Sequence, residues 1–516
     1  MALCLEPLLR IVLEPRMSDL RFLIETHMAQ NEAVGSQQHQ LYGALSAAML
    51  DGSLPAGSVL PSTRSLAKEL GVARNSLIYA YEQLAAEGYV VANRQGTVVA
   101  ALGWAPSVHA RSPQHSDRRG LSTRVSRLSR LRTPQDDLKP FMPGMPALDA
   151  FPLAKWQRAV DRADRGLSSQ ELGYRYALGE PELRQAIATY VRAARGVRCH
   201  VDQVVVTQGT QDSLALCSQL LADVRDVAWI EHPGYPGARM AMEQAGLKLV
   251  PVTVDADGIH PPQHYWQQHP PRLIYTTPSH QYPLGSVLSL ARRMALIDQA
   301  AKQGAWVLED DYDSEFRHDG PPLAAMQGLR DDAPVVYLGT FSKSLFPALR
   351  LGYMVLPEAL VERAGPVLNA WVRAGRVQDQ RALADFINEG HFTTHLRRMR
   401  KLYAQRQAAL RSALAEYWLW PYSLLGGQCG MHLTLAGLPV QDARLADAAL
   451  LQGLSPRALS AYGCGGIEGF EGLVMGYANV PADDMCRHVQ HLAKVVSQLC
   501  RSESSTARPR HLQQSS

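Results

Sequence analysis

The sequence has few cysteines and no long apolar run. Only seven cysteines occur in 516 residues, and none of them forms a Cys-x-x-Cys pair or joins a histidine-rich cluster. This pattern argues against a disulfide framework and favours free thiols in a reducing cytoplasm. Because no stretch is long and apolar enough to cross a bilayer, we expect no transmembrane helix.

The two ends of the chain carry no recognisable signal. Residues 1–34 match no pattern: their apolar start includes charged side chains and lacks a signal-peptide cleavage pattern, and Met17 and Met28 are alternative start positions. Residues 501–516 are polar and predict a disordered tail.

One lysine follows an apolar run in a way that suggests chemistry. Residues 335–338 are typical of a buried strand, and a small polar turn then presents Lys343, with Arg350 shortly after it. A lysine amine forms a Schiff base with an aldehyde cofactor once its surroundings lower its pKa. The hydroxyls of Thr340 and Ser342, beside Arg350, suit a phosphate. A lysine in this position is usually an exposed surface residue, so the hypothesis depends on partners elsewhere.

A second apolar run, residues 305–308, leads into a group of acidic residues that includes Asp310. A carboxylate at the end of a strand can pair with a protonated pyridine nitrogen, the partner that pyridoxal phosphate (PLP) requires. Tyr312 follows at a position suited to donate to the phenolic oxygen of that ring. The alternatives are a solvated acidic loop and a metal site. Because no histidine or further carboxylate has suitable spacing, we predict no metal.

Three more strand-to-loop junctions carry polar or aromatic motifs. Residues 204–207 lead through a glycine turn to Thr210 and Gln211, at the start of an amphipathic helix whose N-terminus can bind phosphate. Tyr235 follows the next strand, where it either stacks on a cofactor ring or belongs to the core. Residues 273–285 complete the set.

These five junctions alternate with helical stretches. The alternation predicts an α/β fold with a mainly parallel sheet and helices on both faces. Every polar motif falls at the carboxyl end of a strand, where open α/β sheets bind ligands. The motifs are therefore expected to meet at one edge of the sheet.

Residues 140–500 resemble the fold type I PLP-dependent aminotransferases. The shared motifs occur in that family's order: Tyr-Arg-Tyr-Ala-Leu-Gly from Tyr174, Thr-Gln-Gly-Thr-Gln from Thr207, Pro-Gly-Tyr-Pro-Gly from Pro233, Thr-Pro-Ser-His-Gln from Thr277, Asp-Asp-Tyr-Asp-Ser-Glu-Phe from Asp310 and Ser-Lys-Ser-Leu-Phe-Pro from Ser342. By this resemblance Lys343 is the Schiff-base lysine, Asp310 the partner of the pyridine nitrogen and Tyr312 the partner of the phenolic oxygen. It also implies that Tyr235 stacks on the ring and that the phosphate side is formed by Thr210, Gln211, Ser342 and Arg350.

The first hundred residues form a different pattern. An apolar-periodic helix over residues 40–50 precedes a second helix capped by Ser62 and closed at Gly71, and a third helix over residues 74–87. The third helix has an apolar face that is expected to pack inward, formed by Leu77, Ala80, Tyr81 and Leu84. A hairpin over residues 89–99 completes a winged helix-turn-helix.

The third helix begins with polar residues, as a recognition helix does when it reads the major groove. Arginine pairs with guanine and asparagine with adenine, whereas hydroxyls at the start of the second helix can fix phosphates. We predict DNA contacts from Ser62, Thr63, Arg64, Arg74, Asn75, Ser76, Tyr79 and Arg94. The alternative is a small helical bundle whose polar side chains are merely solvated.

Residues 35–102 resemble the winged-helix domain of GntR-type regulators. The matching segments are Leu-Pro-Ala-Gly from Leu54, Leu-Pro-Ser-Thr-Arg from Leu60, Leu-Gly-Val-Ala-Arg from Leu70 and Glu-Gly-Tyr from Glu87. The net charge of +4 is too small to identify a partner by itself. Residues 103–139 are rich in Ser, His, Pro and Arg, which predicts a flexible basic linker that either contacts DNA phosphates or serves only as a tether.

A winged helix, a basic linker and an aminotransferase-like domain in one chain resemble the MocR/GabR-type bacterial regulators. The resemblance implies a cytoplasmic head-to-tail homodimer that binds operator DNA, carries PLP and makes no membrane contact. It also implies an effector that is a small amine, an amino acid or PLP itself. We therefore predict a PLP-dependent transcriptional regulator with five segments: 1–34, 35–102, 103–139, 140–500 and 501–516.

The main alternative is a working aminotransferase with an accessory DNA-binding domain. Ordinary aminotransferases hold the substrate carboxylate with a bidentate arginine near the C-terminus. Residues 469–478 contain none, and Arg457 and Arg487 are the nearest. The family's Asn-Pro-Thr-Gly loop is replaced by Tyr-Pro-Leu-Gly from Tyr282. Both departures favour a sensor over an enzyme and an effector other than a standard α-amino acid, with slow transamination left open. A third possibility, a cofactor-free fold, is opposed by the intact set of Lys343, Asp310 and Tyr312.

Overall fold

The computed structural model describes residues 17–30, 36–94, 96–101, 138–318, 320, 323–372, 375–464 and 470–506. The chain divides into two compact units, and the division at Gly120 falls within the predicted linker. Most of that linker lies outside the described residues, as do the first sixteen residues and residues 507–516 of the predicted tail.

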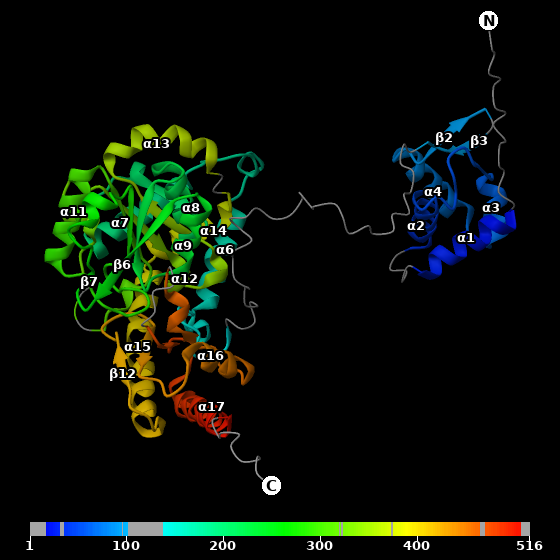
Figure 1. Ribbon diagram of the computed structural model, residues 1–516. Coiled ribbons are helices and arrows are strands. Elements are labelled where there is room, and N and C mark those ends of the chain that lie inside the picture. The colour runs from blue at the N-terminus through cyan, green and yellow to red at the C-terminus, as the bar shows by residue number, and fades with distance from the viewer. Residues whose placement is uncertain are drawn as a thin grey trace, which may run out of the picture. The chain divides into compact units, whose positions relative to one another are not determined.

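The first unit is a winged helix (Figure 1). Its elements are α1 (Met17–Gln30), α2 (Gln37–Leu50), β1 (Val59–Leu60), α3 (Thr63–Leu70), α4 (Arg74–Ala86), β2 (Val90–Asn93) and β3 (Gly96–Val99). The three strands form an antiparallel sheet in the order β1-β3-β2. Ser62 caps α3 by accepting a hydrogen bond from the Ser65 backbone N–H at 3.1 Å, and Gly71 ends that helix with φ of 67°. Both ends of α3 agree with the sequence prediction.

The core of this unit contains the predicted face of the third helix and a helix that we did not expect. Leu77 and Leu84 on α4 are fully buried. They share a core with Leu20 and Ile24 of α1, which are 1% and 0% exposed. The winged-helix core therefore begins before residue 35, inside the segment that the sequence left unassigned. The short strand β1 was also missed.

The second unit is built on an eight-stranded sheet in the order β4-β11-β10-β9-β8-β5-β6-β7. The strands are β4 (Val204–Thr207), β5 (Val227–His232), β6 (Lys248–Asp255), β7 (Gly258–Ile259), β8 (Leu273–Thr276), β9 (Trp306–Asp311), β10 (Val335–Thr340) and β11 (Gly352–Val355). From β10 to β6 the neighbours are parallel, whereas β11 runs antiparallel to β10 and β4, and β7 antiparallel to β6. All five strands that carry the sequence motifs are present, and the mainly parallel sheet is confirmed.

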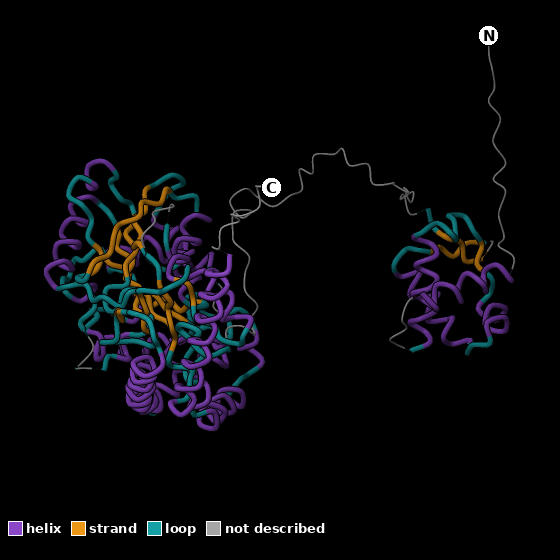
Figure 2. The backbone as a smooth tube through the Cα atoms, turned by 60° about the horizontal axis from the view of Figure 1, so that its bottom comes forward, coloured by secondary structure: helices purple, strands orange, loops and turns teal. Residues whose placement is uncertain are grey.

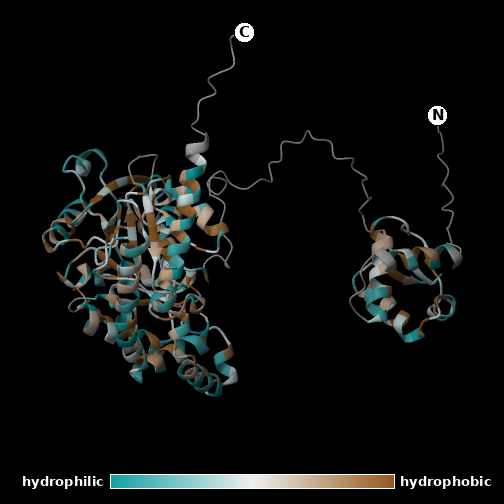
Figure 3. Cartoon of the chain, turned by 90° about the horizontal axis from the view of Figure 1, so that it is seen from below, coloured by the Kyte–Doolittle hydropathy of each residue, from teal (hydrophilic) through white to brown (hydrophobic). Residues whose placement is uncertain are grey.

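Helices surround this sheet, as Figure 2 shows with strands inside and helices outside. They are α6 (Leu153–Arg165), α7 (Pro181–Arg195), α8 (Thr210–Leu221), α9 (Pro236–Gln244), α10 (Tyr265–Gln268), α11 (Leu290–Gln303), α12 (Phe341–Ser344), α13 (Glu358–Trp371) and α14 (Val377–Asn388). The central strands are largely hydrophobic and the outer helices carry hydrophilic faces (Figure 3). This pattern is expected for parallel strands that are covered on both faces.

A smaller C-terminal part follows the long helix α15 (His391–Tyr417) and lies at one end of the second unit in Figure 1. It contains β12 (Ser423–Leu425), β13 (His432–Ala436), α16 (Asp442–Leu451), β14 (Arg457–Ala458), β15 (Gly472–Gly476) and α17 (Met485–Thr506). The four strands form an antiparallel sheet in the order β12-β13-β15-β14. Helix α17 extends six residues past residue 500, so the beginning of the expected tail is helical.

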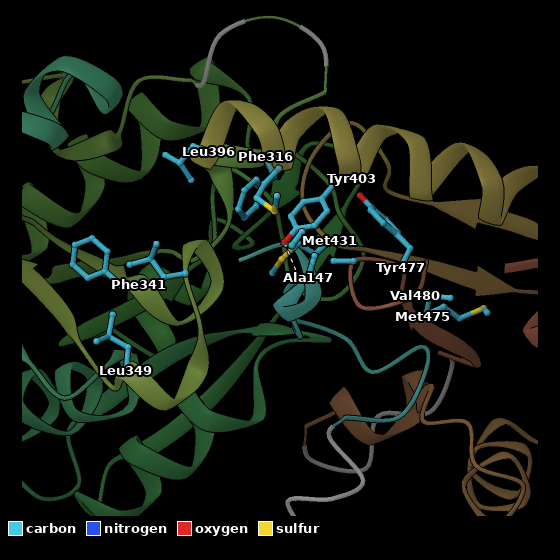
Figure 4. Close-up of a cluster of buried hydrophobic side chains, with 14 of the residues drawn as sticks. Ala147, Phe316, Phe341, Leu349, Leu396, Tyr403, Met431, Met475, Tyr477 and Val480 are labelled. Carbon is cyan, nitrogen blue, oxygen red and sulfur yellow. Dashed lines mark hydrogen bonds between the residues drawn. The ribbon is translucent and has the colours of Figure 1, made fainter. Parts of the chain in front are cut away.

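One hydrophobic core joins the C-terminal part to the large sheet (Figure 4). Phe316, just after β9, packs edge-on against Tyr403 of α15 with ring centroids 4.8 Å apart. The Tyr403 hydroxyl accepts a hydrogen bond from the Ala147 backbone N–H at 3.1 Å. These contacts hold the segment around residues 141–147 against the carboxyl edge of the sheet.

Two expectations about the chain as a whole can be compared with the structure. The six cysteines among the described residues are all unpaired, in agreement with the prediction of free thiols. In the same residues no helix combines the length and the apolar character that crossing a membrane would need.

Candidate functional site

A cavity of about 190 Å³ lies where the parallel strands end. Its walls contain every residue that the sequence predicted for a cofactor: Thr210, Gln211, Tyr235, Asp310, Tyr312, Ser342, Lys343 and Arg350. Further wall residues that the sequence did not single out include Pro143, Gly144, Tyr275, Thr277 and Tyr282. Residues from segments more than two hundred positions apart thus meet at one edge of the sheet.

Lys343 lies in α12, the short helix that directly follows β10. The Thr340 side chain caps α12 by accepting from the Ser342 backbone N–H at 3.2 Å, which fixes the turn. Gly144 closes over the lysine from the other side, because a Cβ at that position would lie 3.0 Å from Nζ. Gly144 also has φ of +73°, a conformation that favours glycine. The amine is therefore half-buried and faces the cavity.

Asp310 is 3% exposed and forms part of the cavity wall. The Tyr275 hydroxyl donates to its Oδ2 atom at 2.8 Å, while its Oδ1 atom has no hydrogen-bond partner within the described structure. Burial raises the pKa of this carboxyl to about 7, against the hydrogen bond from Tyr275. A buried carboxylate oxygen without a partner is costly, so a cationic N–H donor in the cavity would stabilise it.

Tyr235 lies on the wall at the N-terminal end of α9. Its ring packs over Gly237, where an added Cβ would be 2.4 Å from the ring, so only glycine fits beneath it. Gln211 braces the same turn by donating to the Gly237 carbonyl at 3.0 Å. Burial raises the pKa of Tyr235 to about 12, so its phenol stays protonated and uncharged. The ring is thus a neutral aromatic face on the cavity.

A corner of the cavity is suited to a phosphate. Helix α8 begins there at Thr210, and the first N–H groups of a helix attract anions. Ser342 adds a hydroxyl, and Arg350 adds an exposed guanidinium to the same wall. The unpaired Asp310 oxygen, Lys343 and this corner therefore provide the three kinds of contact that PLP requires, and the residues fit that cofactor.

Glu231 at the end of β5 is a buried residue that sequence reasoning missed. It is 2% exposed and accepts hydrogen bonds from the Thr276 hydroxyl, the Thr277 hydroxyl and backbone N–H, and Gln281 Nε2, at 2.6–3.1 Å. Burial raises its pKa, and these donors oppose the rise. The network ties β5 to the loop after β8, which carries the wall residues Thr277 and Tyr282.

Asp311 forms a second buried network that the sequence did not reveal. Arg195, on α7, donates to its Oδ2 atom at 2.6 Å, and the Tyr337 hydroxyl donates to the same atom at 2.6 Å. The Arg195 and Asp311 side chains are 1% and 3% exposed. This pair fixes the backbone of β9 between Asp310 and Tyr312, so it supports both wall residues.

Three residues from distant segments could present ligands to a metal ion. His280, Asp313 and His432 each offer an atom, and these atoms lie within 4.8 Å of one another. The sequence showed no metal spacing because the three residues lie on separate segments. His280 Nδ1 already pairs with Asp313 at 2.9 Å, and the same nitrogen lies 3.0 Å from the Tyr312 hydroxyl. The group of His280, Asp313 and His432 therefore contacts the cavity wall through Tyr312.

The C-terminal sheet contains no arginine at the position that the aminotransferase resemblance would suggest. Strand β15 contains no arginine, and the neighbouring strand β14 places Arg457 directly opposite Val474 of β15. Arg457 contacts the Met142 sulfur at 3.2 Å. Arg487 lies on α17, where it pairs with Asp484 at 2.7 Å. Of the two arginines nearest in sequence, Arg457 is therefore the one on the sheet.

Of the winged-helix residues predicted to contact DNA, Thr63, Ser76 and Tyr79 are half-buried and the others are exposed. Arg64, Arg74, Asn75 and Arg94 are exposed. None of these three arginines has an ion-pair partner within the part of the chain that the structure describes. Tyr79 is half-buried, and its hydroxyl lies 3.3 Å from His39 Nε2 on α2. The start of α4 therefore presents uncommitted donors, while Tyr79 is also engaged within the unit.

Comparisons with known proteins agree with this architecture. Residues 146–492 match the family described as aminotransferase class I and II, and residues 37–99 match the bacterial regulatory proteins of the gntR family. The probable rhizopine catabolism regulatory protein MocR of Rhizobium meliloti is 39% identical over 91% of this chain and 95% of its own length. The HTH-type pyridoxine biosynthesis transcriptional regulator PdxR of Corynebacterium glutamicum is 30% identical over 86% of this chain and 93% of its own.

Among solved structures, the α-aminoadipate aminotransferase of Thermus thermophilus, complexed with N-(5'-phosphopyridoxyl)-L-leucine, has a TM-score of 0.65 and 25% identity. It covers 74% of this chain and 98% of its own. The fold type I prediction is confirmed. This chain belongs to the MocR-type transcriptional regulators, in which a gntR-family winged helix is joined to a class I and II aminotransferase domain.

Proposed function

We propose that this transcriptional regulator binds operator DNA through its winged helix and carries PLP at Lys343 as part of a sensor for a small molecule. The observation that carries the proposal is the unpaired Oδ1 atom of buried Asp310, in a cavity that also contains Lys343. A cofactor with a pyridine nitrogen and an aldehyde would meet both needs at once.

Each wall residue has a role in this proposal. PLP supplies an aldehyde that reacts with amines. Lys343 provides the amine that holds it, Asp310 pairs with the ring nitrogen, and Tyr312 donates to the phenolic oxygen. The ring lies against Tyr235. The phosphate is held by Thr210, Gln211, Ser342 and Arg350.

The effector is either PLP itself or a small amino compound that competes with Lys343 for the aldehyde. The name of the Corynebacterium relative connects that protein to pyridoxine biosynthesis, which supports the first option. The Rhizobium relative is named for rhizopine catabolism, so regulators of this type differ in what they control. We also infer a head-to-tail homodimer in the cytoplasm, which would place two winged helices on two half-sites of the operator.

Cofactor attachment can be tested directly. Protein purified with PLP should be coloured, and borohydride reduction should fix the cofactor to the peptide that contains Lys343. Lys343→Ala should abolish this labelling, because no other lysine lines the described cavity wall. Lys248→Ala removes an exposed lysine at the start of β6 and should leave the labelling intact. Label on a different lysine would contradict the assignment.

Coupling between cofactor and DNA needs a second measurement. A DNA fragment that the protein selects from a random pool would be titrated with apoprotein, with PLP-loaded protein, and with PLP-loaded protein plus single amines or amino acids. Each titration is repeated with Lys343→Ala. A ligand changes DNA affinity only if it binds two arrangements of the protein unequally. Equal DNA affinity in all these states would leave the second unit as a scaffold for dimerisation.

A working aminotransferase is the second candidate, and the intact Lys343, Asp310 and Tyr312 favour it. Single-turnover conversion of PLP by amino acids, followed by absorbance, measures this activity without any DNA. Because β15 lacks an arginine that could hold a substrate carboxylate, we expect conversion to be slow. Conversion at several turnovers per second across standard amino acids, a rate typical of enzymes, would instead favour the enzyme.

A further inference from the structure

The cavity wall includes Tyr312, and the residues behind it have no role in the proposal above. The Tyr312 oxygen lies 3.0 Å from His280 Nδ1. The same nitrogen lies 2.9 Å and 3.1 Å from the two carboxylate oxygens of Asp313. The His280 and Asp313 side chains are 1% and 0% exposed, so water does not compete for these contacts. One imidazole nitrogen therefore faces two partners in a dry environment.

With Asp313 ionised, only one arrangement of protons satisfies both contacts. An ionised carboxylate can accept but not donate, so Asp313 requires a hydrogen on His280 Nδ1. That N–H can be shared with the Tyr312 oxygen, which then accepts as well. Suppose instead that Nδ1 carried a lone pair. An ionised Asp313 would then place its carboxylate against that lone pair with no proton between them. A protonated Asp313 would compete with the Tyr312 hydroxyl to donate to the same nitrogen. The geometry favours the Nδ1–H form of His280.

The other nitrogen of His280 agrees with this assignment. Nε2 is buried and has no hydrogen-bond partner among the described residues, as expected for a nitrogen that carries no proton to donate. It faces Gly285, where an added Cβ would lie 3.2 Å away. The ring of His432 lies 4.9 Å from the ring of His280.

The pair is also held from the C-terminal part of the chain. Gly430, just before β13, has φ of +84°, and a Cβ there would lie 2.2 Å from His280 Cε1 and 2.4 Å from Asp313 Oδ2. Any side chain at position 430 would therefore displace both residues. Tyr312 and His432 both lie against the His280 ring.

We propose that Asp313 and His280 are positioning residues for Tyr312: they make its hydroxyl oxygen accept from His280 and so direct its own proton into the cavity, toward a ligand. The Tyr312 hydroxyl has one proton, and because its oxygen accepts from His280 Nδ1 that proton is left to donate on the cavity side. This inference rests on the proposed function for the identity of the ligand as PLP. It extends that proposal to two residues that do not line the cavity.

The first test needs no cofactor. In full-length apoprotein labelled with nitrogen-15 at histidine, the side-chain signals of His280 should show hydrogen on Nδ1. The signals are assigned by their loss in His280→Asn. Asp313→Asn removes the carboxylate that fixes the tautomer, so His280 should shift toward the Nε2–H form. Hydrogen on Nε2 in the wild-type protein would overturn the proposal, whether or not PLP binds.

The second test uses PLP and a double-mutant cycle. Tyr312→Phe and His280→Leu should each weaken PLP binding about two- to tenfold, as expected for one hydrogen bond. In the Tyr312→Phe background, His280→Leu should cause no further loss, because it acts through the missing hydroxyl. Independent, multiplying losses would indicate a merely structural role and overturn the proposal.

Two amide variants of His280 separate the loss of a hydrogen bond from a general disturbance of the fold. Asparagine places an amide nitrogen where Nδ1 stands, whereas glutamine places it near Nε2. His280→Asn should therefore retain near wild-type PLP affinity, and His280→Gln should resemble His280→Leu. Equal behaviour of the two amides would contradict the inference. If wild-type protein takes up no PLP, the proposed function fails, and the tautomer measurement still decides the role of Asp313 and His280.

Discussion

The two units of this chain present their functional side chains in opposite ways. In the winged helix, Arg74 and Arg94 are exposed and without ion-pair partners within the described residues, on a surface supported by a small core. In the aminotransferase domain, Asp310 and the pair of His280 and Asp313 are buried and bonded to neighbours. DNA is a long polyanion, and exposed side-chain donors on a protein surface can bind its phosphates. A small ligand requires buried groups that are fixed before it arrives.

The difference shows where each site would be sensitive to substitution. A lost surface arginine removes one contact and leaves the fold intact. A changed buried group alters the protonation and packing of its neighbours, so its effect extends to stability and to pH dependence.

Asp310→Asn should change the stability of the apoprotein and its dependence on pH. The folded pKa of Asp310 is about 7, whereas an unfolded aspartate has about 3.9. Between these values the unfolded chain has released the proton that the folded chain still holds, so rising pH destabilises the fold. At pH 8 the variant should be more stable than wild type, by no more than about 4 kcal/mol. At pH 4 the two should be similar.

Thermal unfolding of apoprotein at both pH values checks this, with Asp161→Asn, an exposed residue of α6, as the control. PLP should reverse the order, because the wild-type carboxylate gains a cationic partner and the amide does not. If wild type and Asp310→Asn unfold at the same temperature at pH 4 and pH 8, the carboxyl does not bear the burial cost assigned to it.

Ile24→Ala should destabilise the winged-helix unit by about 2–5 kcal/mol, because Ile24 is fully buried in its core. Phe22→Ala, on the same helix, removes a side chain that is 72% exposed and should change stability little. Circular dichroism during heating and DNA binding at the same temperature would follow the loss. Equal stability of the two variants would mean that α1 is an appendage, and the DNA-binding unit would then begin at α2.

Arg74→Ala should weaken operator binding by about 1–3 kcal/mol and relax the preference at one base pair. The fold should not change, since Arg74 is exposed at the start of α4. Titrations at several salt concentrations separate a base contact from a phosphate contact, which would lower the salt dependence by about one unit. Arg21→Ala removes the same charge from α1, where Arg21 pairs with Glu25, and serves as the control. Undiminished affinity in Arg74→Ala would exclude α4 as the recognition helix.

The sequence predicted the two folds and the cavity wall because each depends on local patterns. Strand ends followed by polar residues located Asp310, Tyr312 and Lys343, and the resemblance to aminotransferases gave their order. The sequence could not predict His280, Asp313 and His432 as a group, because these residues come together only when β13 packs against the loop after β8. Glu231 was missed for the same reason: its four hydrogen bonds come from residues forty-five to fifty positions away.

Helix α1 was missed because it has no strong pattern. Its apolar residues Leu20 and Ile24 are spaced as on a helix face, but exposed Phe22 lies between them and obscures the periodicity. The strands of the C-terminal sheet were missed because they are short and pair across long separations. Local sequence patterns therefore predicted the site residues at the strand ends better than they predicted where each folded unit begins and ends.

The Ser62 hydroxyl has two predicted roles, as the cap of α3 and as a donor to a DNA phosphate, and substitutions of Ser62 can separate them. Its oxygen accepts from the Ser65 N–H and caps α3, while its proton is free to donate to a DNA phosphate. Ser62→Ala should cost about 1 kcal/mol of stability in the winged-helix unit, and Ser62→Gly only a few tenths. If the hydroxyl also contacts DNA, both variants should lose operator affinity equally despite their different stabilities. Affinity that instead follows stability would show that Ser62 acts only as a cap and does not contact DNA.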